Sequence, residues 1–347
     1  MRNLIVLLDG ATDERIPQLG GRTPLEAAEK PFIDRITSSG RFGCTDASSY
    51  THLYLLGLLS QREGELPRGL IETLGFDLEV PPGKVAYRLS PAMIRDGWME
   101  WGYNITPQEV EELKRAVADN WDLLLPHDPE MRYYKEGKGV ITLRSEAPLD
   151  LPSPPVNTYL DMNRLGEFRD FVEGVSKETC GIAELPWQGG RGELVQEYRD
   201  LREKFGNMTV YSNSPSALGI GALLGMEKVW VDDLDQRLRG TVEALETRDV
   251  LLHMEEIDDV SHKREPDKKL EFLEEVDKVM ERYLDGIEGV RISLTVDHGA
   301  SSLTGQHLTE PVPFAVAEGI GDTAEISFKE TSSGHVPLFQ LLDLLYR

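Results

Sequence analysis

The sequence predicts an α/β protein with a mostly parallel sheet flanked by helices, and with a smaller α+β domain inserted into it. Two observations carry this prediction. Five short apolar runs, rich in leucine and β-branched residues, each stop abruptly at polar residues, which is typical of buried parallel strands. Segments with apolar residues at helical spacing lie between these runs, and strands that alternate with helices form parallel sheets covered on both faces.

The main sheet is predicted to contain five strands, Asn3–Leu8, Met208–Ser212, Lys228–Val231, Val250–His253 and Ile292–Val296. Four of the segments between them have a helical pattern, Pro24–Ser38, Gly190–Lys204, Ser216–Leu224 and Pro266–Leu284. The last segment shows the pattern best, with apolar residues at Leu270, Leu273, Val276, Val279, Met280 and Tyr283. Each helix therefore has an apolar face to pack on the sheet.

The middle third of the chain has a different pattern. Leu78–Trp101 is predicted to form a set of short strands, with a turn at Pro81, Pro82 and Gly83. Val140–Arg144 is predicted to be another strand, and the proline-rich stretch Ala147–Val156 is irregular.

Thr106–Asn120 is predicted to be an amphipathic helix in this region, because Thr106 can cap it and Pro107 suits its first turn. A length of 347 residues is also more than one average domain needs. We therefore expect a discontinuous domain formed by residues 1–75 and 176–347, and an inserted substrate or lid domain formed by residues 76–175.

The composition limits the partners and the location. With 37 Lys and Arg against 61 Asp and Glu, the net charge is −24, which repels nucleic acid and anionic membranes and favours cations. Cys44 and Cys180 are the only cysteines, so we expect no disulfide framework and a reducing, cytoplasmic location. The apolar run before Asp9 is too short for a signal peptide or a membrane span.

Polar residues follow the predicted strands at the points where ligands of parallel sheets bind. Asp9 follows the first strand, Asp258 and His262 lie four residues apart after another, and Asp297 and His298 follow the last. Four of the seven histidines cluster in this part of the chain, His253, His262, His298 and His307. A lone Asp after a strand is more often a helix cap, but this combination indicates a metal site. Mixed carboxylate and imidazole ligands suit Mn²⁺, Zn²⁺ or Fe²⁺ better than Ca²⁺ or Mg²⁺.

Several longer segments occur in one order along the chain: LLDGATDERIPQLGGRTPLEAAEKPFIDRI, LYLLGL, PRGLIETLG, PPGKVAYRL, LLHMEEIDDVSHKREPDKKLEFLEEVDKV and TVDHGASSLTGQHLTEPVPF. Over these segments, roughly half of the chain, the sequence resembles archaeal-type cofactor-independent phosphoglycerate mutases of the alkaline phosphatase superfamily. The resemblance implies an alkaline-phosphatase-like fold, a phosphoserine intermediate, a small phosphorylated metabolite as substrate, and two divalent metal ions, Mn²⁺ or Zn²⁺.

The resemblance also implies roles for individual residues. One metal is expected to bind Asp9, Asp297, His298 and the oxygen of a nucleophilic serine, and the other to bind Asp258, His262 and His307. The motif places the nucleophile at Ser48, at the start of a helix that contains Leu53–Leu56, where a helix N-terminus favours phosphate. Ser48 could instead be only a helix cap, and Ser49 or Thr51 could carry the phosphate. Arg68 is expected to clamp a phosphate through its planar guanidinium group.

The segments expected to bind phosphoglycerate differ from the family pattern. The family has an arginine-rich segment where this chain has RDGWMEWGYN, and it has lysines at the positions of Leu218 and Gly305. The loop before the nucleophile is cut to TDAS, and Ser49 stands where an Asp is expected. The residues that could replace the missing cations are Arg88, Arg95, Arg191 and His52.

Three functions are therefore compatible with the sequence. The first is a phosphoglycerate mutase with a rearranged substrate pocket, and the second is a phosphomonoesterase or another phosphotransferase on the same metals. The third is a metal-binding interaction protein that has lost catalysis. Matching residues at all seven metal positions argue against the third, because fold stability requires no such pair of ligand sets.

Overall fold

The computed structural model describes residues 1–102, 105–154 and 156–346. The chain forms two compact units, one made of Met1–Glu65 and Asp200–Arg347 and the other of Leu66–Arg199. The second unit contains the predicted insert, residues 76–175, and extends beyond this insert at both ends. The end of the segment RDGWMEWGYN, residues 103–104, lies outside the described residues.

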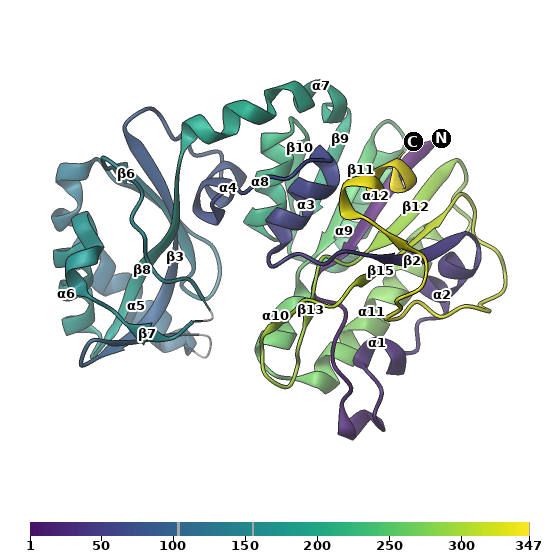
Figure 1. The fold of residues 1–347 in the computed structure, drawn as a ribbon, viewed down its shortest axis with the longest axis horizontal. Coiled ribbons are helices and arrows are strands. Elements are labelled where there is room, and N and C mark those ends of the chain that lie inside the picture. Colours follow the sequence, from purple (N-terminus) through teal and green to yellow (C-terminus); the bar gives the residue numbers. More distant parts are fainter. Residues whose placement is uncertain (103–104, 155, 347) are drawn as a thin grey trace. The chain divides into compact units, whose positions relative to one another are not determined.

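The first unit contains an eight-stranded sheet in its described part, in the order β10-β9-β11-β1-β12-β15-β2-β16 (Figure 1). Five of its strands are parallel and confirm the predicted ones to within two residues at either end, β1 Arg2–Leu8, β9 Met208–Ser212, β10 Glu227–Trp230, β11 Asp249–Met254 and β12 Val290–Thr295. Residues Asn3 to Leu8 of β1 are all buried, as a central strand covered on both faces requires.

The rest of this sheet was not predicted. β15 (Val312–Ala317) pairs antiparallel with both β12 and β2 (Arg41–Thr45), and β16 (His335–Val336) is a two-residue strand at the edge. A small ladder of β13 (Gly299–Ala300) and β14 (His307–Leu308) lies apart from the main sheet. β2 and β13 each contain a glycine and β15 a proline, while β14 and β16 are only two residues long, so these sequences carry a weak strand signal.

The described helices of the first unit pack on both faces of its sheet (Figure 1). One group is α1 (Pro24–Ala27), α2 (Pro31–Ser38), α9 (Leu234–Leu245), α10 (Glu256–His262) and α11 (Pro266–Leu284), and the other is α3 (Thr51–Ser60), α8 (Pro215–Leu223) and α12 (Leu338–Leu345). A short 3-10 helix, η1 (Pro17–Leu19), precedes α1.

Two predicted helices were wrong in part. Pro24–Ser38 is not continuous, because Lys30 precedes Pro31 and is held outside the helical region, as the residue before a proline usually is. Gly190–Lys204 begins as the end of strand β8, continues as a 3-10 helix, η5 (Gly192–Leu201), and is α-helical only in α7 (Arg202–Phe205).

The second unit has a six-stranded sheet in its described part, in which β3 is central. Its strands are β3 Lys84–Arg95, β4 Trp98–Trp101, β5 Glu130–Tyr133, β6 Gly139–Arg144, β7 Thr158–Tyr159 and β8 Ile182–Arg191. The predicted set of short strands in residues 78–101 is therefore one long strand and one short strand. β8 was not predicted.

The helices of the second unit are α4 (Arg68–Gly75), α5 (Pro107–Asp119) and α6 (Arg169–Glu178), with 3-10 helices η2 (Trp121–Leu123), η3 (Leu125–His127) and η4 (Met162–Phe168). The predicted cap of α5 is confirmed, since Thr106 and Glu109 form a reciprocal capping box. The buried side chains of this unit form their own core, which contains Leu89, Leu113 and Phe168.

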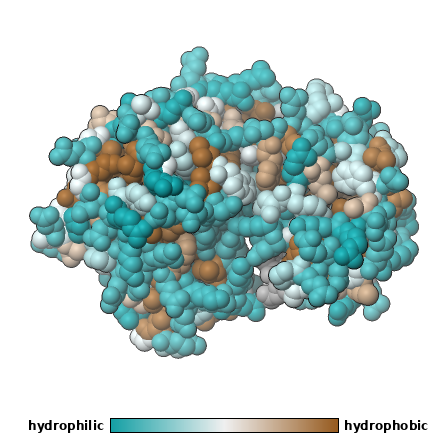
Figure 2. Space-filling view, turned by 180° about the vertical axis from the view of Figure 1, so that it is seen from behind, coloured by the Kyte–Doolittle hydropathy of each residue, from teal (hydrophilic) through white to brown (hydrophobic). Residues whose placement is uncertain are grey.

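The molecular surface is largely polar on the face that Figure 2 shows. The face shown in Figure 2 is mostly hydrophilic, with apolar residues in small scattered groups. Within the described residues, every helix is too short or too polar to cross a lipid bilayer.

Candidate metal centre and active site

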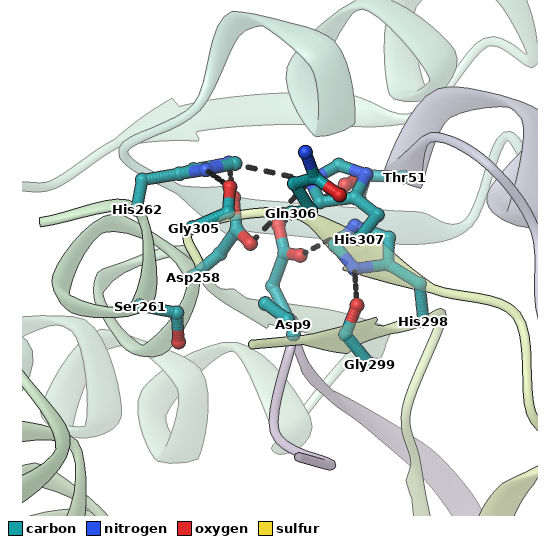
Figure 3. A network of polar contacts seen from close by, with 12 residues as sticks. Asp9, Thr51, Asp258, Ser261, His262, His298, Gly299, Gly305, Gln306 and His307 are labelled. Carbon is teal, nitrogen blue, oxygen red and sulfur yellow. Dashed lines mark hydrogen bonds and ion pairs between the residues drawn. The ribbon is translucent and has the colours of Figure 1, made fainter. Parts of the chain in front are cut away.

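The candidate ligands gather at one edge of the main sheet. β1 lies between β11 and β12 and runs parallel to both, so the carboxyl ends of the three strands are neighbours. Asp9 directly follows β1, α10 with Asp258 and His262 follows β11, and Asp297 follows β12 shortly. Figure 3 shows how Asp9, Asp258, His262, His298 and His307 converge there.

One set of ligand atoms comes from Asp9, Asp297 and His298, and we call it the first metal set. The Nε2 atom of His298 lies 3.3 Å from Asp9 Oδ1 and 3.4 Å from Asp297 Oδ2. All three side chains are buried, and among the described residues none of these three atoms has a hydrogen-bond partner. Buried polar atoms without a partner are costly, and a bound cation would satisfy all three at once.

A second set consists of Asp258, His262 and His307, and we call it the second metal set. His262 Nε2 lies 3.1 Å from Asp258 Oδ2, and His307 Nε2 lies 3.6 Å from Asp258 Oδ1. The Nε2 atoms of the two histidines are 3.2 Å apart. Asp258 also lies within ligand distance of Asp9 and His298, so it belongs to the surroundings of both sets.

The tautomers of the three histidines follow from their other ring nitrogens. Nδ1 faces a backbone carbonyl oxygen in each ring, that of Gly305 for His262 (2.8 Å), of Ser49 for His307 (2.8 Å) and of Gly299 for His298 (3.2 Å). A carbonyl oxygen only accepts, so Nδ1 carries the hydrogen and Nε2 of the neutral ring presents a lone pair. This is the arrangement in which histidines bind metals, with Nδ1–H held by a second partner.

The charge of the site also fits a cation. Burial, and after it the charge of Asp297, raise the pKa of Asp9 well above its ordinary value. Burial and the neighbouring His298 lower the pKa of His307 to about 4, so its ring is neutral at pH 7. Carboxylates and imidazoles that lie this close together can be shared as ligands by divalent metals.

His253 has a role that the sequence analysis did not assign to it. It is fully buried at the end of β11, and its Nε2–H donates to Asp9 Oδ2 at 2.9 Å while its Nδ1 accepts from the Ser212 hydroxyl at 2.8 Å. This holds Asp9 so that its other oxygen, Oδ1, faces His298. The clustering of four histidines was the available signal, but a buried histidine beside an aspartate cannot be distinguished from a ligand in sequence alone.

The helix expected to start at Ser48 starts three residues later. α3 begins at Thr51, and the preceding Tyr50 is extended. The N–H of Ser48 donates instead to the carbonyl oxygen of Asp297 at 2.9 Å, which holds this stretch outside the helix. The Thr51 hydroxyl donates to Asp9 Oδ2 at 3.1 Å and so contacts a carboxylate of the first metal set.

The predicted phosphate clamp, Arg68, is the first residue of α4 in the second unit. Its Nε donates to Glu72 at 2.6 Å, and Arg88 forms an ion pair with the same carboxylate. Glu72 is fully buried, so its negative charge needs the two positively charged arginines beside it.

The other residues considered for substrate binding lie in different elements of the structure. Arg95 is exposed at the end of β3, Arg191 ends β8 opposite Val85, and His52 is buried in α3. Leu218, where the family has a lysine, is buried in α8.

A buried ion pair braces the loop that follows β1. Lys269 of α11 donates to Asp13 Oδ2 (3.0 Å) and to the carbonyl oxygens of Thr12 (3.1 Å) and Ala300 (2.7 Å), and the side chains of both charged residues are fully buried. Ser302 also donates to Asp13. The pair thereby ties α11 to the loops after β1 and β12.

Replacing Lys269 with Met is expected to lower the free energy of unfolding by about 3–5 kcal/mol, because it leaves Asp13 as a buried charge without its cation. Urea denaturation would measure the change. The double variant Lys269→Met/Asp13→Asn should recover part of the loss. An effect of Lys269→Met below about 1 kcal/mol would contradict a role in bracing these loops.

Comparison with known proteins gives a consistent result. The family model described as the metalloenzyme superfamily matches residues 1–336. The chain is 27% identical to a 2,3-bisphosphoglycerate-independent phosphoglycerate mutase of Methanopyrus kandleri, over 90% of this chain and 86% of that protein. It is 28% identical to the protein of the same name from Pyrobaculum islandicum, over 89% of this chain and 86% of that protein.

Two solved structures share the fold. A protein of Pyrococcus horikoshii matches with a TM-score of 0.75 and 20% identity, over 99% of this chain and 96% of that one. A cofactor-independent phosphoglycerate mutase of Thermoplasma acidophilum matches with a TM-score of 0.56 and 18% identity, over 99% of this chain and 98% of that one.

Proposed function

The chain belongs to the metalloenzyme superfamily, and from this premise we propose that it is a two-metal phosphoryl-transfer enzyme of the phosphoglycerate mutase type. The observation that carries the proposal is the pairing of lone-pair Nε2 atoms with buried carboxylate oxygens. His262 and His307 bring two such nitrogens to 3.2 Å from each other, and His298 faces two carboxylates. Nitrogen lone pairs and carboxylate oxygens that face one another in a buried site are stabilised when a cation binds between them.

The two sets would hold two metal ions beside the hydroxyl that accepts the phosphoryl group. Asp9, Asp297 and His298 would hold one metal beside the start of α3, and Asp258, His262 and His307 would hold the other. Bound divalent ions supply charge neutralisation for the transferred phosphoryl group. Mn²⁺ or Zn²⁺ fits ligand sets that mix imidazole and carboxylate. A hydroxyl at or just before the start of α3, for which the sequence motif selects Ser48, would accept the phosphoryl group.

A small phosphorylated metabolite is the proposed substrate, with phosphoglycerate as the first choice because several relatives carry the name phosphoglycerate mutase. Arg68 remains the candidate clamp for its phosphate. A cytoplasmic location accompanies this proposal, since Cys44 and Cys180 are free thiols. The acidic surface disfavours nucleic acid and anionic membranes as partners.

A phosphomonoesterase is the second candidate, and a specific observation favours it. Arg68 and Arg88 both bind the buried carboxylate of Glu72, so part of their positive charge is already matched. After the phosphoryl group has been transferred to the enzyme, an alcohol held by fewer unmatched cations leaves sooner, and water then has more opportunity to take the phosphoryl group.

The metal content tests the proposal directly. Elemental analysis of protein loaded with Mn²⁺ or Zn²⁺ is expected to find about two ions per chain, one for each ligand set. Asp297→Asn/His298→Ala should reduce the content by about one ion, and so should His262→Ala/His307→Ala. The matched control is Asp249→Asn, because Asp249 is a buried aspartate at the opposite, amino end of β11. A content near zero in the wild type would refute the proposed site.

A further inference from the structure

We propose that the first unit binds a small phosphate-bearing metabolite in a cavity near the amino end of β12, at the other end of this strand from the metal centre. The cavity has a volume of about 430 Å³ and is lined by two arginines, Arg291 near the start of β12 and Arg41 at the start of β2. Asp297 follows the opposite, carboxyl end of β12. The inference is independent of the proposed function, because no candidate metal ligand lines the cavity.

Three neighbouring strands bring the two arginines together. β15 lies between β12 and β2 and pairs antiparallel with both (Figure 1). The register places Val316 of β15 beside both Ser293 and Arg41. Because alternate residues of a strand share a face, Arg291, two residues before Ser293, points to the same face as Arg41. The backbone therefore places both guanidinium groups on the face of the sheet where the cavity lies.

The guanidinium group of Arg291 is only partly satisfied. Arg291 is buried, with 7% of its surface exposed, and its Nη2 atom forms an ion pair with Glu318, which also lines the cavity. Within the described ranges, its Nε and Nη1 atoms have no hydrogen-bond partner. Buried donors without an acceptor are costly, so an oxyanion in the adjoining cavity would be stabilised by this side chain.

The charges around the cavity also favour an anion. Arg41 is exposed, and its side chain has no ion-pair partner in the part of the chain that the structure describes. The side chain of Glu318 is 61% exposed, so it can turn towards solvent at a small cost. Two arginines against one carboxylate leave a local excess of positive charge, in a chain whose net charge is −24.

The lining indicates a phosphate group joined to a small organic part. Guanidinium groups bind phosphate oxygens through pairs of parallel hydrogen bonds, and two of them match the two negative charges of a phosphate. The volume falls in the range of small-molecule sites, and Val316 and Leu344 add apolar surface for the rest of the ligand. A carboxylate carries a single charge and matches only one of the arginines.

Calorimetry with inorganic phosphate as the probe tests this inference. The full chain would be titrated in EDTA, which keeps metals out of the candidate centre, and one phosphate per chain is expected to bind. Arg291→Met and Arg41→Met should each weaken this binding about ten-fold or more, since each removes a charged donor. Arg239→Met is the matched control for Arg41→Met, because Arg239 is an exposed arginine of α9.

The carboxylate at the cavity provides a test of opposite sign. Glu318→Gln removes the charge that competes for Arg291, so it should tighten phosphate binding about two- to five-fold. Glu271→Gln makes the same chemical change at an exposed position of α11 and should leave the affinity unchanged.

Melting temperatures would establish that the variants are folded, and the exposed Arg41 keeps the test decisive if Arg291→Met is unstable. Phosphate binding that neither Arg41→Met nor Glu318→Gln changes would overturn the inference. So would absence of binding by the wild type, or binding of acetate as tight as that of phosphate. Absence of metal-dependent phosphate transfer would overturn the proposed function and leave this inference standing.

Discussion

Replacing Asp297 with Asn is expected to reduce metal-dependent phosphate release about a thousand-fold. Asp297 is fully buried, its Oδ1 accepts from the N–H groups of Gly10 and His298, and its Oδ2 belongs to the first metal set. The amide keeps the shape of the side chain but removes the negative charge that would hold a cation. The loss should therefore appear in catalysis and metal affinity, and not in folding.

Phosphate release from p-nitrophenyl phosphate with saturating Mn²⁺ would measure this effect. Asp249→Asn is again the matched control, because it makes the same chemical change at a buried aspartate that hydrogen-bonds Asn3 and Tyr346 at the other end of β11. This control should keep kcat within about threefold of the wild type, as expected for a change outside the site. Activity of Asp297→Asn within tenfold of the wild type would exclude a metal at this carboxylate.

The second large effect concerns the division between mutase and phosphatase activity. Mutase activity on 3-phosphoglycerate is expected to be well below that of a relative with the arginine-rich segment, together with measurable phosphatase activity. Each lost charged partner of a substrate carboxylate or phosphate costs about 2–5 kcal/mol, or roughly thirty-fold to several-thousand-fold in transition-state binding. Arg68 and Arg88 share Glu72, so they compensate only in part.

An enolase-coupled mutase assay beside a phosphate-release assay on the same preparation would compare the two activities. Glu72→Gln provides a sharper test, because it frees the two arginines from their shared carboxylate while keeping a similar shape. Mutase activity should rise relative to phosphatase activity if those arginines contact substrate. Efficient mutase turnover by the wild type with negligible phosphate release would contradict the argument.

The parallel strands and their ligands were predictable from the sequence because both follow local rules. The central strand β1 is apolar from Leu4 to Leu8 and is followed directly by Asp9, and Asp297 follows two residues after the end of β12. The mostly parallel sheet between helices was predicted correctly for this reason. The antiparallel strands β2 and β15 were missed, since a Gly or Pro in a short strand weakens the pattern on which prediction depends.

The start of α3 could not be predicted because it depends on contacts that are distant in sequence. The motif puts the hydroxyl at Ser48, but the N–H of Ser48 is bound by Asp297 and the carbonyl oxygen of Ser49 by His307. The part of His253 in holding Asp9 is equally non-local, since Ser212 and Asp9 must both come beside it. Sequence spacing identifies groups that can bind metal, but not the hydrogen bonds that orient them.

The closeness of the two metal sets has a consequence for how the protein would take up its ions. Asp258 lies within ligand distance of members of both sets, and the rings of His298 and His307, one from each set, are stacked with their centroids 3.9 Å apart. An ion in either set would fix a side chain against which the other set is built. Thermodynamic linkage makes such an influence reciprocal, so occupation of either set would change the affinity of the other by the same factor. The affinity measured for one ion would then depend on the concentration of the other, and removing the ligands of one set should change how tightly the remaining ion binds.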